Sequence, residues 1–207
     1  MKDNKDLKDT YNRIAKDWIT DHVGDNWWVE GTDIFLSLLP KGASILDVGC
    51  AGGYKVKYMT DKGFNVEGID FSENMIKEAK ERFLEFSFKV FDIYDLDKYS
   101  KTFDAIFSQA VLLHIPKKRI LEVLEKIKSR INKGGLLHIS LKETRDKTIE
   151  EEVRKENDYG YEYERFFSYY TLEEIEEYFK QIGLEVISKR VTDSGRSNWI
   201  NIVGKKL

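Results

Sequence analysis

Short, continuous hydrophobic runs alternate with helix-like stripes along the chain from residue 44 onward. Runs of this length predict buried strands, and they occur in "SILDVG", "NVEGID", "SFKVFDI", "FDAIFSQA" and "GGLLHISL". Apolar residues at helical spacing lie between the runs, over residues 54–62 and 116–131. Strands that alternate with helices predict a parallel sheet covered by helices on both faces.

Capping signals mark the start of two further helices. Ser72 is expected to cap a helix that runs to about Phe83. Thr171, with Glu174 three residues later, forms the pattern of a capping box. It predicts a helix that continues to Gly183.

The two ends of the chain differ from this alternation. Residues 1 to about 39 have the pattern of helices rich in aromatic side chains. The tail carries two strand-like segments, "LEVISKRV" and "NWINIVGKK", joined by "TDSGRS". This loop is too short for a crossover helix, so the two strands must pair antiparallel. We therefore predict a Rossmann-like, doubly wound α/β fold with seven strands, mostly parallel and with an antiparallel C-terminal strand.

At 207 residues, the chain is expected to form one domain. We divide it by pattern into four segments: an N-terminal helical cap (1–43), a ligand-binding core (44–143), a lid-like insertion (144–170), and a C-terminal helix with a β-hairpin (171–207). The charge-rich stretch "TRDKTIEEEVRKEND" at the start of the insertion predicts a solvated helix face.

Composition excludes several classes of function. The net charge is -3, from 34 basic and 37 acidic residues, so no global field favours nucleic acid or an anionic membrane. No apolar run approaches the ~18 residues of a membrane span, and the charged start "MKDNKDLKDTYNR" does not fit a secretory signal. A cytoplasmic location is the default expectation. Cys50 is the single cysteine, which excludes an internal disulfide and a cysteine-based zinc site; we expect no metal.

A glycine turn follows the first predicted strand in "DVGCAGG". Its glycines depart from the G-x-G-x-x-G spacing of dinucleotide sites, and Asp47 stands two residues ahead of the first. Gly49, Ala51 and Gly53 would let the backbone approach a ligand closely. A carboxylate here suits a cationic ligand, because it would repel a pyrophosphate.

Acids also follow the second and third predicted strands. Ligands of open α/β sheets bind beyond the carboxyl ends of the strands, where Asp70 and Asp92 are expected. S-adenosylmethionine (SAM) gives each acid a role, since Asp70 can accept from both ribose hydroxyls and Asp92 from the adenine amino group. Phe71 or Ile93 can contact the adenine ring. An aspartate that only forms a turn is the alternative for Asp92.

Over residues 40 to 207, the chain resembles the class I SAM-dependent methyltransferases, with the small-molecule, type 11-like branch nearest. The segments that carry the resemblance are "ILDVGCAGG", "VEGIDFSENMI", "VFDI", "FDAIFSQAVLLHI" and "INKGGLLHIS". Ala51 replaces the middle glycine of the family's turn. No motif identifies the acceptor.

The resemblance implies an enzyme that moves the SAM methyl group to an O, N, S or C nucleophile of a small molecule and releases S-adenosylhomocysteine. The implied cofactor-binding residues are Tyr11, Asp47, Gly49, Ala51, Gly53, Asp70, Phe71, Met75, Asp92, Ile93 and Gln109. For Met75, a place in the core is the alternative.

The predicted acceptor side has fewer signals. His114 is a candidate general base, with a structural histidine as the alternative, and His138 is expected in the core. Candidate substrate-binding residues are Trp27, Tyr163, Arg165 and Phe167. Arg165 could instead bond to nearby glutamates, and the insertion could be packed rather than mobile.

Other functions stay open at this level. Of the candidate site residues, only Asp70 is compatible with an NAD-dependent oxidoreductase. All of the candidate cofactor-binding residues are compatible with a non-catalytic SAM-binding protein. Within the methyltransferase class, protein or tRNA acceptors are alternatives to a small molecule. The oligomeric state has no signal in the sequence.

Overall fold

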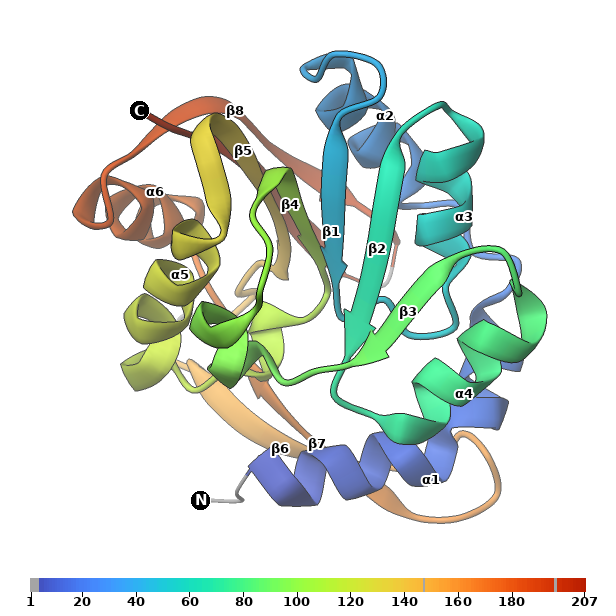
Figure 1. Ribbon diagram of the computed structural model, residues 1–207. Coiled ribbons are helices and arrows are strands. Elements are labelled where there is room, and N and C mark those ends of the chain that lie inside the picture. Colours follow the sequence, from blue (N-terminus) through green and yellow to red (C-terminus); the bar gives the residue numbers. More distant parts are fainter. Residues whose placement is uncertain (1–3, 147, 196) are drawn as a thin grey trace.

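A seven-stranded sheet forms the centre of the molecule, which we describe from a computed structural model covering residues 4–146, 148–195 and 197–207. The strand order is β3-β2-β1-β4-β5-β9-β8 (Figure 1). The strands are β1 (Ser44–Val48), β2 (Asn65–Asp70), β3 (Ser87–Val90), β4 (Phe103–Gln109), β5 (Ile131–Lys142), β8 (Leu184–Asp193) and β9 (Asn198–Lys206). Residues 1–3 of the predicted cap, 147 of the predicted insertion and 196 of the tail loop lie outside the described residues.

The pairing of the strands confirms the predicted fold class. Strands β1 to β5 pair in parallel throughout. Strand β9 runs antiparallel to both β5 and β8, so the last two strands form the expected hairpin at the edge of the sheet. The carboxyl ends of β1, β2 and β4 therefore meet at one edge, where a ligand would bind.

Helices cover both faces of the sheet. They are α2 (Val29–Ser37), α3 (Tyr54–Asp61), α4 (Glu73–Arg82), α5 (Ile120–Ser129) and α6 (Leu172–Gln181), with short 3₁₀ turns η1 (Ile93–Lys98), η2 (Leu112–His114) and η3 (Lys117–Arg119). Figure 1 shows α5 and α6 on one side of the sheet and α2 and α3 on the other. The apolar faces of α5 and α6 enter the largest core cluster, while α2 and α3 pack on the opposite face.

Both predicted caps are present. The Ser72 hydroxyl accepts from the Met75 N–H at 3.1 Å. Thr171 and Glu174 exchange the two bonds of a capping box, at 3.2 and 2.7 Å. Each cap satisfies backbone N–H groups that the first turn of a helix leaves without partners.

The segment 144–170 forms an antiparallel hairpin of β6 (Glu151–Glu156) and β7 (Tyr163–Ser168). The prediction of a helix in the charge-rich stretch is wrong, because β6 lies within it. The aromatic-rich β7 pairs with β6 along all six of its residues, and this tertiary pairing overrides the local composition. The side chains of β6 are exposed or half-buried, so its charges remain solvated.

Helix α1 (Asn4–His22) crosses below the sheet, between α4 and the β6–β7 hairpin (Figure 1). The Asn12 side chain accepts from the Ser72 hydroxyl at 2.7 Å, which ties α1 to the start of α4. On its other side, Thr10 donates to the Glu164 carbonyl at 3.1 Å, and the Tyr161 hydroxyl donates to Asp17 at 2.6 Å. The helix is thus fixed to two elements that are distant in sequence.

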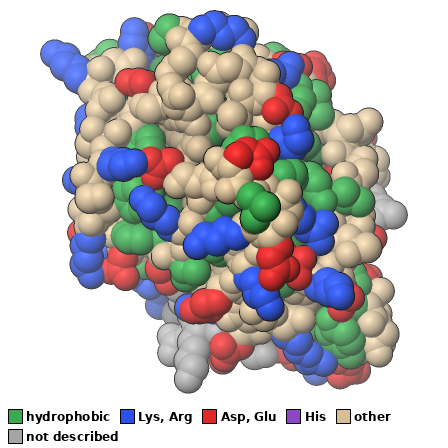
Figure 2. All heavy atoms as spheres, turned by 45° about the vertical axis from the view of Figure 1, so that its right-hand side comes forward, with side chains coloured by type: hydrophobic (Ala, Val, Ile, Leu, Met, Phe, Trp, Pro, Cys, Tyr) green, Lys and Arg blue, Asp and Glu red, His purple; other side chains and the backbone are tan. Residues whose placement is uncertain are grey.

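The surface carries mixed charge. On the side of the molecule that Figure 2 turns forward, basic and acidic side chains are interspersed. Such mixing gives no extended field of one sign over the described part of this face. None of the described helices is long and apolar enough to cross a membrane.

Candidate cofactor and acceptor site

A cavity of about 360 Å³ opens at the carboxyl ends of β1, β2 and β4 and is closed on one side by α1. It brings together many of the residues predicted from sequence, namely Tyr11, Trp27, Gly49, Ala51, Asp70, Phe71, Met75, Ile93, Gln109 and His114. The predicted residues that do not line it are Asp47, Gly53, Asp92, Tyr163, Arg165 and Phe167.

The turn after β1 has the backbone conformation that its glycines suggested. Gly49 and Gly53 have φ of 78° and 82°, and Ala51 also has a positive φ, 45°. Positive φ is unfavourable for alanine, but the Ala51 N–H donates to the Asp70 carboxylate at 3.1 Å, which holds the strained residue in place. The Ile69 carbonyl accepts from the N–H groups at the start of the turn.

The glycines of the turn face different surroundings. A Cβ on Gly53 would lie 2.6 Å from the Phe88 ring, so this glycine faces the core below the turn and not the cavity. A Cβ on Gly52 would lie 3.0 Å from Ile19 of α1. The sequence-based reason for Gly53, that a side chain there would fill the ligand space, therefore does not apply. Close packing against Phe88 is the reason instead.

Asp70 is a fixed acceptor at the end of β2. Its two carboxylate oxygens accept from the N–H groups of Ser72 at 2.9 Å and of Ala51 at 3.1 Å. Burial raises the pKa of Asp70 to about 6, although the hydrogen bonds from the backbone N–H groups oppose this rise. A carboxylate held in this way is oriented before a ligand arrives, as recognition of a diol requires.

Two buried oxygens near the ends of β1 and β4 have no hydrogen-bond partner among the described residues. They are Gln109 Oε1, whose residue lines the cavity, and Asp47 Oδ2, whose residue does not. Burial raises the pKa of Asp47 to about 7, and the charge of Lys55 opposes this rise. Since buried polar atoms are normally satisfied, the Gln109 oxygen fits a ligand that brings its own donors, such as an ammonium group.

Lys55 is a site residue that sequence reasoning missed. It lies in the first turn of α3, lines the cavity, and has its pKa lowered mainly by burial. Its ammonium lies 5.5 Å from the Trp28 ring centroid, and the negative charge of Asp47 opposes the lowering of its pKa. Its place two residues after Gly53, at the start of the helix that follows the turn, is the signal that could have found it.

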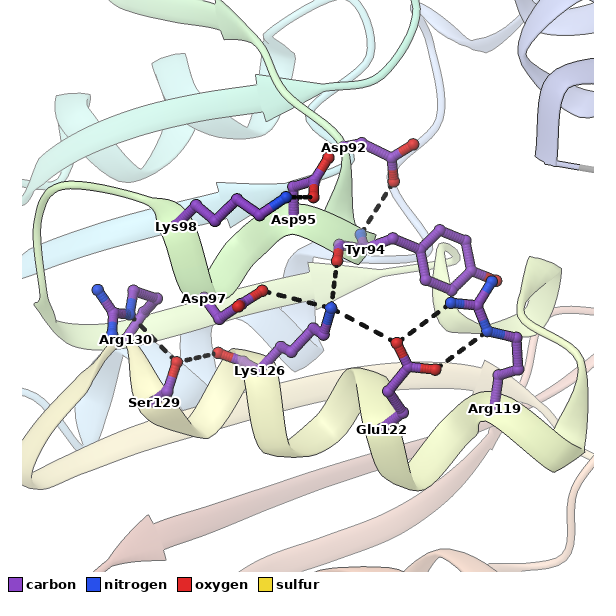
Figure 3. Close-up of polar contacts among 10 residues, drawn as sticks. All are labelled: Asp92, Tyr94, Asp95, Asp97, Lys98, Arg119, Glu122, Lys126, Ser129 and Arg130. Atoms are coloured by element: carbon purple, nitrogen blue, oxygen red, sulfur yellow. Dashed lines mark hydrogen bonds and ion pairs between the residues drawn. The ribbon is translucent and has the colours of Figure 1, made fainter.

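Asp92 caps the turn η1, as the alternative interpretation proposed. Its Oδ1 accepts from the Tyr94 N–H at 2.9 Å. Figure 3 shows how α5 and the preceding η3 hold the same turn: the Lys126 ammonium of α5 donates to the Tyr94 carbonyl at 2.6 Å, and the Arg119 guanidinium of η3 lies 3.8 Å from the Tyr94 ring centroid. This network fixes the loop from which Ile93 reaches the cavity.

His114 is held in one tautomer. Its Nδ1 lies 2.6 Å from the Phe166 carbonyl, which can only accept, so Nδ1 carries the proton. Nε2 then accepts from the Tyr11 hydroxyl at 2.7 Å. Loss of water around the ring lowers the pKa of His114 to about 3, so the imidazole is neutral near pH 7.

The hairpin residues act behind the cavity wall. Arg165 bonds both oxygens of Glu156, at 2.6 and 2.7 Å, so it has the glutamate partner that was the alternative to acceptor binding. A third nitrogen of Arg165 lies 3.4 Å from the Tyr11 hydroxyl. Tyr163 and Phe167 are buried within the hairpin and against the core. Their role in acceptor binding stays a prediction.

Trp27 lines the cavity and stacks on Trp199, with 4.5 Å between ring centroids. Trp18 and Trp28, two further aromatic residues of the predicted N-terminal cap, line it as well, and so does Phe91, which was not among the predicted site residues. Among the described residues, no three His, Cys, Asp or Glu side chains gather in a way that could hold a metal.

Comparison with known proteins places this geometry in a family. A family model described as a methyltransferase domain matches residues 26–189. Ubiquinone biosynthesis O-methyltransferases of Coxiella burnetii and Xanthomonas campestris are 33% identical over 104 residues, which are 48% of this chain. The match covers 44% and 43% of those proteins, so this chain spans less than half the length of the curated relatives it matches.

Solved structures share the fold. Magnesium protoporphyrin IX methyltransferase from Synechocystis, with bound SAM, has a TM-score of 0.76 at 16% identity, over 100% of this chain and 98% of that one. The 1,6-didemethyltoxoflavin-N1-methyltransferase of Burkholderia thailandensis, with bound S-adenosylhomocysteine, has a TM-score of 0.77 at 17% identity, over 98% and 88%. The family model covers most of the chain and confirms the resemblance seen in its motifs. The chain therefore belongs to the methyltransferase domain family.

Proposed function

We propose that this protein is a SAM-dependent methyltransferase that acts on a small-molecule acceptor. The observation that carries the proposal is the buried Gln109 oxygen, which has no partner among the described residues, in the wall of a cavity that also presents the fixed carboxylate of Asp70. These acceptors suit an ammonium and a ribose diol. They do not suit the pyrophosphate of a dinucleotide, which supports SAM over the NAD alternative.

Each part of the wall has a role toward such a ligand. Asp70 would accept from the ribose hydroxyls, Gln109 would accept from the ammonium, and Lys55 would pair with the carboxylate, while Asp47 adds negative charge behind this wall. The side chain of Ile93 contacts the adenine. When bound, SAM supplies an electrophilic methyl group on its sulfonium.

The chain's own residues then orient the acceptor and exclude water. Tyr11, Trp27 and His114 line the cavity together, and such positioning is the main contribution of a protein to a transfer between bound groups. A pKa of about 3 makes His114 a weak base near neutral pH. Its bonds support a positioning role instead, in which neutral His114 holds the Tyr11 hydroxyl. The base role predicted from sequence stays an untested alternative.

A small-molecule acceptor is supported by the names of the similar proteins: an O-methyltransferase of ubiquinone biosynthesis, a magnesium protoporphyrin IX methyltransferase and a 1,6-didemethyltoxoflavin-N1-methyltransferase. The cavity of about 360 Å³, which includes the cofactor residues, lies in the lower range of small-molecule sites. We propose that α1 and the β6–β7 hairpin together enclose the acceptor end, with the hairpin acting through Tyr11 and His114.

Titration calorimetry with SAM, S-adenosylhomocysteine and NADH tests the proposal. We expect the first two ligands to bind and NADH not to bind. Asp70→Ala should weaken SAM binding by about 10- to 100-fold, because charge-assisted hydrogen bonds contribute roughly 1.5–3 kcal/mol. Asp95→Ala is a matched control, since Asp95 is exposed and does not line the cavity. Binding of NADH without SAM, or equal SAM affinity in both variants, would overturn the assignment.

A further inference from the structure

Three tryptophans line the cavity, and the proposed function assigns none of them to SAM. Trp18 lies on α1, and Trp27 and Trp28 stand directly before α2. All three residues are half-buried, so each keeps surface that the folded chain does not cover. The cavity therefore has an aromatic part, which we define by these three residues.

The aromatic part adjoins the end of the cavity that would hold the methionine of SAM. The Lys55 ammonium, which would pair with the SAM carboxylate, lies 5.5 Å from the Trp28 ring centroid. Trp18 follows Tyr11 by two helical turns on α1, and both line the cavity. Because the sulfonium adjoins the methionine of SAM, a molecule in the aromatic part would lie close to the methyl group.

Trp27 is oriented before any ligand binds. Its ring stacks on the buried Trp199 with 4.5 Å between centroids and 20° between planes. Its Nε1–H donates to the Asp25 carboxylate at 3.3 Å. One face of the Trp27 ring is covered by this stack, and a ligand would meet a wall that does not have to be ordered first.

The other two tryptophans also have ring partners in the protein. Trp18 stacks on His22 with 4.1 Å between centroids, and the edge of one ring meets the face of the other where Trp28 contacts Tyr58, at 5.1 Å. Among the described residues, no ring contact joins any two of the three tryptophans. Three rings that line one cavity without stacking on each other keep their uncovered surfaces for a ligand.

The charged side chains around the aromatic part balance. Among the described residues that line the cavity here, two are basic and two are acidic: Lys55, Lys57, Asp25 and Asp61. Lys57 pairs with Asp61 on α3. The negative charge of Asp25 opposes the lowering of the pKa of Lys55, as an attractive neighbour does. The sum of these charges is zero, so the aromatic part offers no excess charge to an ionic acceptor, whose burial would be costly.

We propose that the aromatic part is an acceptor subsite for an uncharged, planar aromatic molecule. Flat rings are stabilised by offset or edge contacts with indole rings, and the balanced charges favour a neutral molecule. The inference rests on the proposed function and adds the chemical class of its acceptor. The three tryptophans are specificity residues, because they contact the ring of the acceptor and not the reacting atoms.

Probes that share one carbon skeleton test this subsite without knowledge of the natural acceptor. The protein, saturated with S-adenosylhomocysteine, is titrated by calorimetry at neutral pH with 2-naphthol, decahydro-2-naphthol and 2-naphthoate. The first probe is planar and uncharged, the second is uncharged but not planar, and the third is planar but charged.

The variants are Trp28→Leu, Trp18→Leu and Trp28→Phe. Phe86→Leu is a matched control, because Phe86 is also half-buried and contacts another ring, 5.9 Å away on Phe83, but does not line the cavity. The phenylalanine variant keeps an aromatic ring at the position and separates loss of the ring from loss of volume.

We expect 2-naphthol to bind about tenfold more tightly than each of the other two probes. Its preference over decahydro-2-naphthol should fall about two- to tenfold in both leucine variants, and it should persist in Trp28→Phe and Phe86→Leu. The subsite is overturned if no probe binds, if the two alcohols bind equally, or if the leucine variants keep the full preference. Tighter binding of 2-naphthoate overturns the assignment to an uncharged acceptor.

Calorimetry with S-adenosylhomocysteine on each variant separates this subsite from the proposed function. No binding of S-adenosylhomocysteine by the parent protein counts against the proposed function. Normal binding without a preference for the planar probe counts against the aromatic part alone. Normal binding by the leucine variants also shows that they are folded, so that a lost preference reports the missing indole ring.

Discussion

The cofactor side and the acceptor side of the cavity are built in different ways. On the cofactor side, contacts are local: Asp70 accepts from an N–H two residues later and from one 19 residues earlier. On the acceptor side, Tyr11 bonds His114 across 103 residues and approaches Arg165 across 154. Both sides use hydrogen bonds of similar length. Only the contacts on the cofactor side can be inferred from the spacing of residues along the chain.

The difference teaches that the two sides depend on different parts of the fold. The cofactor side is determined by the sheet and the turn that follows each strand. The acceptor side needs α1 and the β6–β7 hairpin to meet over the sheet. Changes on the acceptor side should therefore affect stability and turnover together, whereas changes on the cofactor side should act at one turn.

The largest effect is expected from Arg165→Ala. Removing the arginine leaves the Glu156 carboxylate unpaired in a site where only 18% of its side chain is exposed, which should cost about 3 kcal/mol of unfolding free energy. Urea denaturation measures this. Arg154→Ala is the control on the same hairpin, because its pair with Glu152 is 48% and 32% exposed and should contribute less than about 1 kcal/mol. Equal losses would show that the hairpin is not held by a buried pair.

A pair of alanine substitutions tests the cofactor turn. Gly53 and Gly42 have nearly the same φ, 82° and 79°, but an added Cβ meets the Phe88 ring at 2.6 Å in the first and nothing within 4 Å in the second. Both variants should lose stability from the positive φ. Gly53→Ala should lose about 1–3 kcal/mol more, because it also overpacks the core. Thermal or urea unfolding that finds no difference would contradict the packing assigned to this turn.

Tyr11 and His114 provide a sharper test of the acceptor side. If His114 acts by holding the Tyr11 hydroxyl, Tyr11→Phe and His114→Ala should each lower kcat by about tenfold, the effect of one hydrogen bond. The double variant should be no slower than either single one. A loss of roughly 10²–10⁴ in His114→Ala alone, with a pH profile that changes, would instead show a general base.

The smallest effect concerns His138, which lies inside β5. Both of its ring nitrogens lack partners among the described residues, it stacks on Phe107, and burial lowers its pKa to about 3. The unfolded chain binds a proton there below about pH 6.5 and the folded chain does not, so stability falls as pH falls from about 6.5 toward 3. His138→Phe removes this dependence.

The measurement is urea denaturation of parent and variant at pH 7 and 5.5. The parent should lose about 1.2 kcal/mol more than His138→Phe over this interval. Comparison of the two proteins is needed because Asp47 and Asp70, with raised pKa values of about 7 and 6, act in the opposite direction. As the pH falls, these two carboxyl groups bind protons in the folded state before they do so in the unfolded chain. This adds free energy of unfolding and offsets part of the loss caused by His138. Identical pH dependence would exclude the proposed environment of His138.

Much of the fold could be predicted because its signals are local. The caps at Ser72 and Thr171, and the short loop before β9, give element boundaries and strand direction without tertiary information. Asp70 could also be predicted as a site residue, because its place at the end of β2 follows from the local pattern of that strand. The strand β6 could not be predicted, since its charged residues become a strand only when β7 supplies the backbone partners.

The candidate site shows the same division. Asp92 follows its strand as expected, but its place at the cap of η1, outside the cavity lining, depends on how the loop turns. The position of Gly53 over Phe88 and the pairing of Arg165 with Glu156 are contacts between separate strands or between a turn and a strand. The sequence offered a glutamate partner for Arg165 only as one of two alternatives, and it gave no sign of the contact between Gly53 and Phe88.

Helix α1 has a consequence for the kinetics of ligand exchange. It contributes Leu7, Tyr11 and Ile19 to the cavity wall and is bonded to α4 and to the hairpin on its two sides. A ligand that crosses this wall must wait until the helix detaches, so its association rate reaches a plateau set by helix opening and not by diffusion. A ligand that leaves across this wall depends on the same opening, and so on the bonds that Asn12 and Thr10 make.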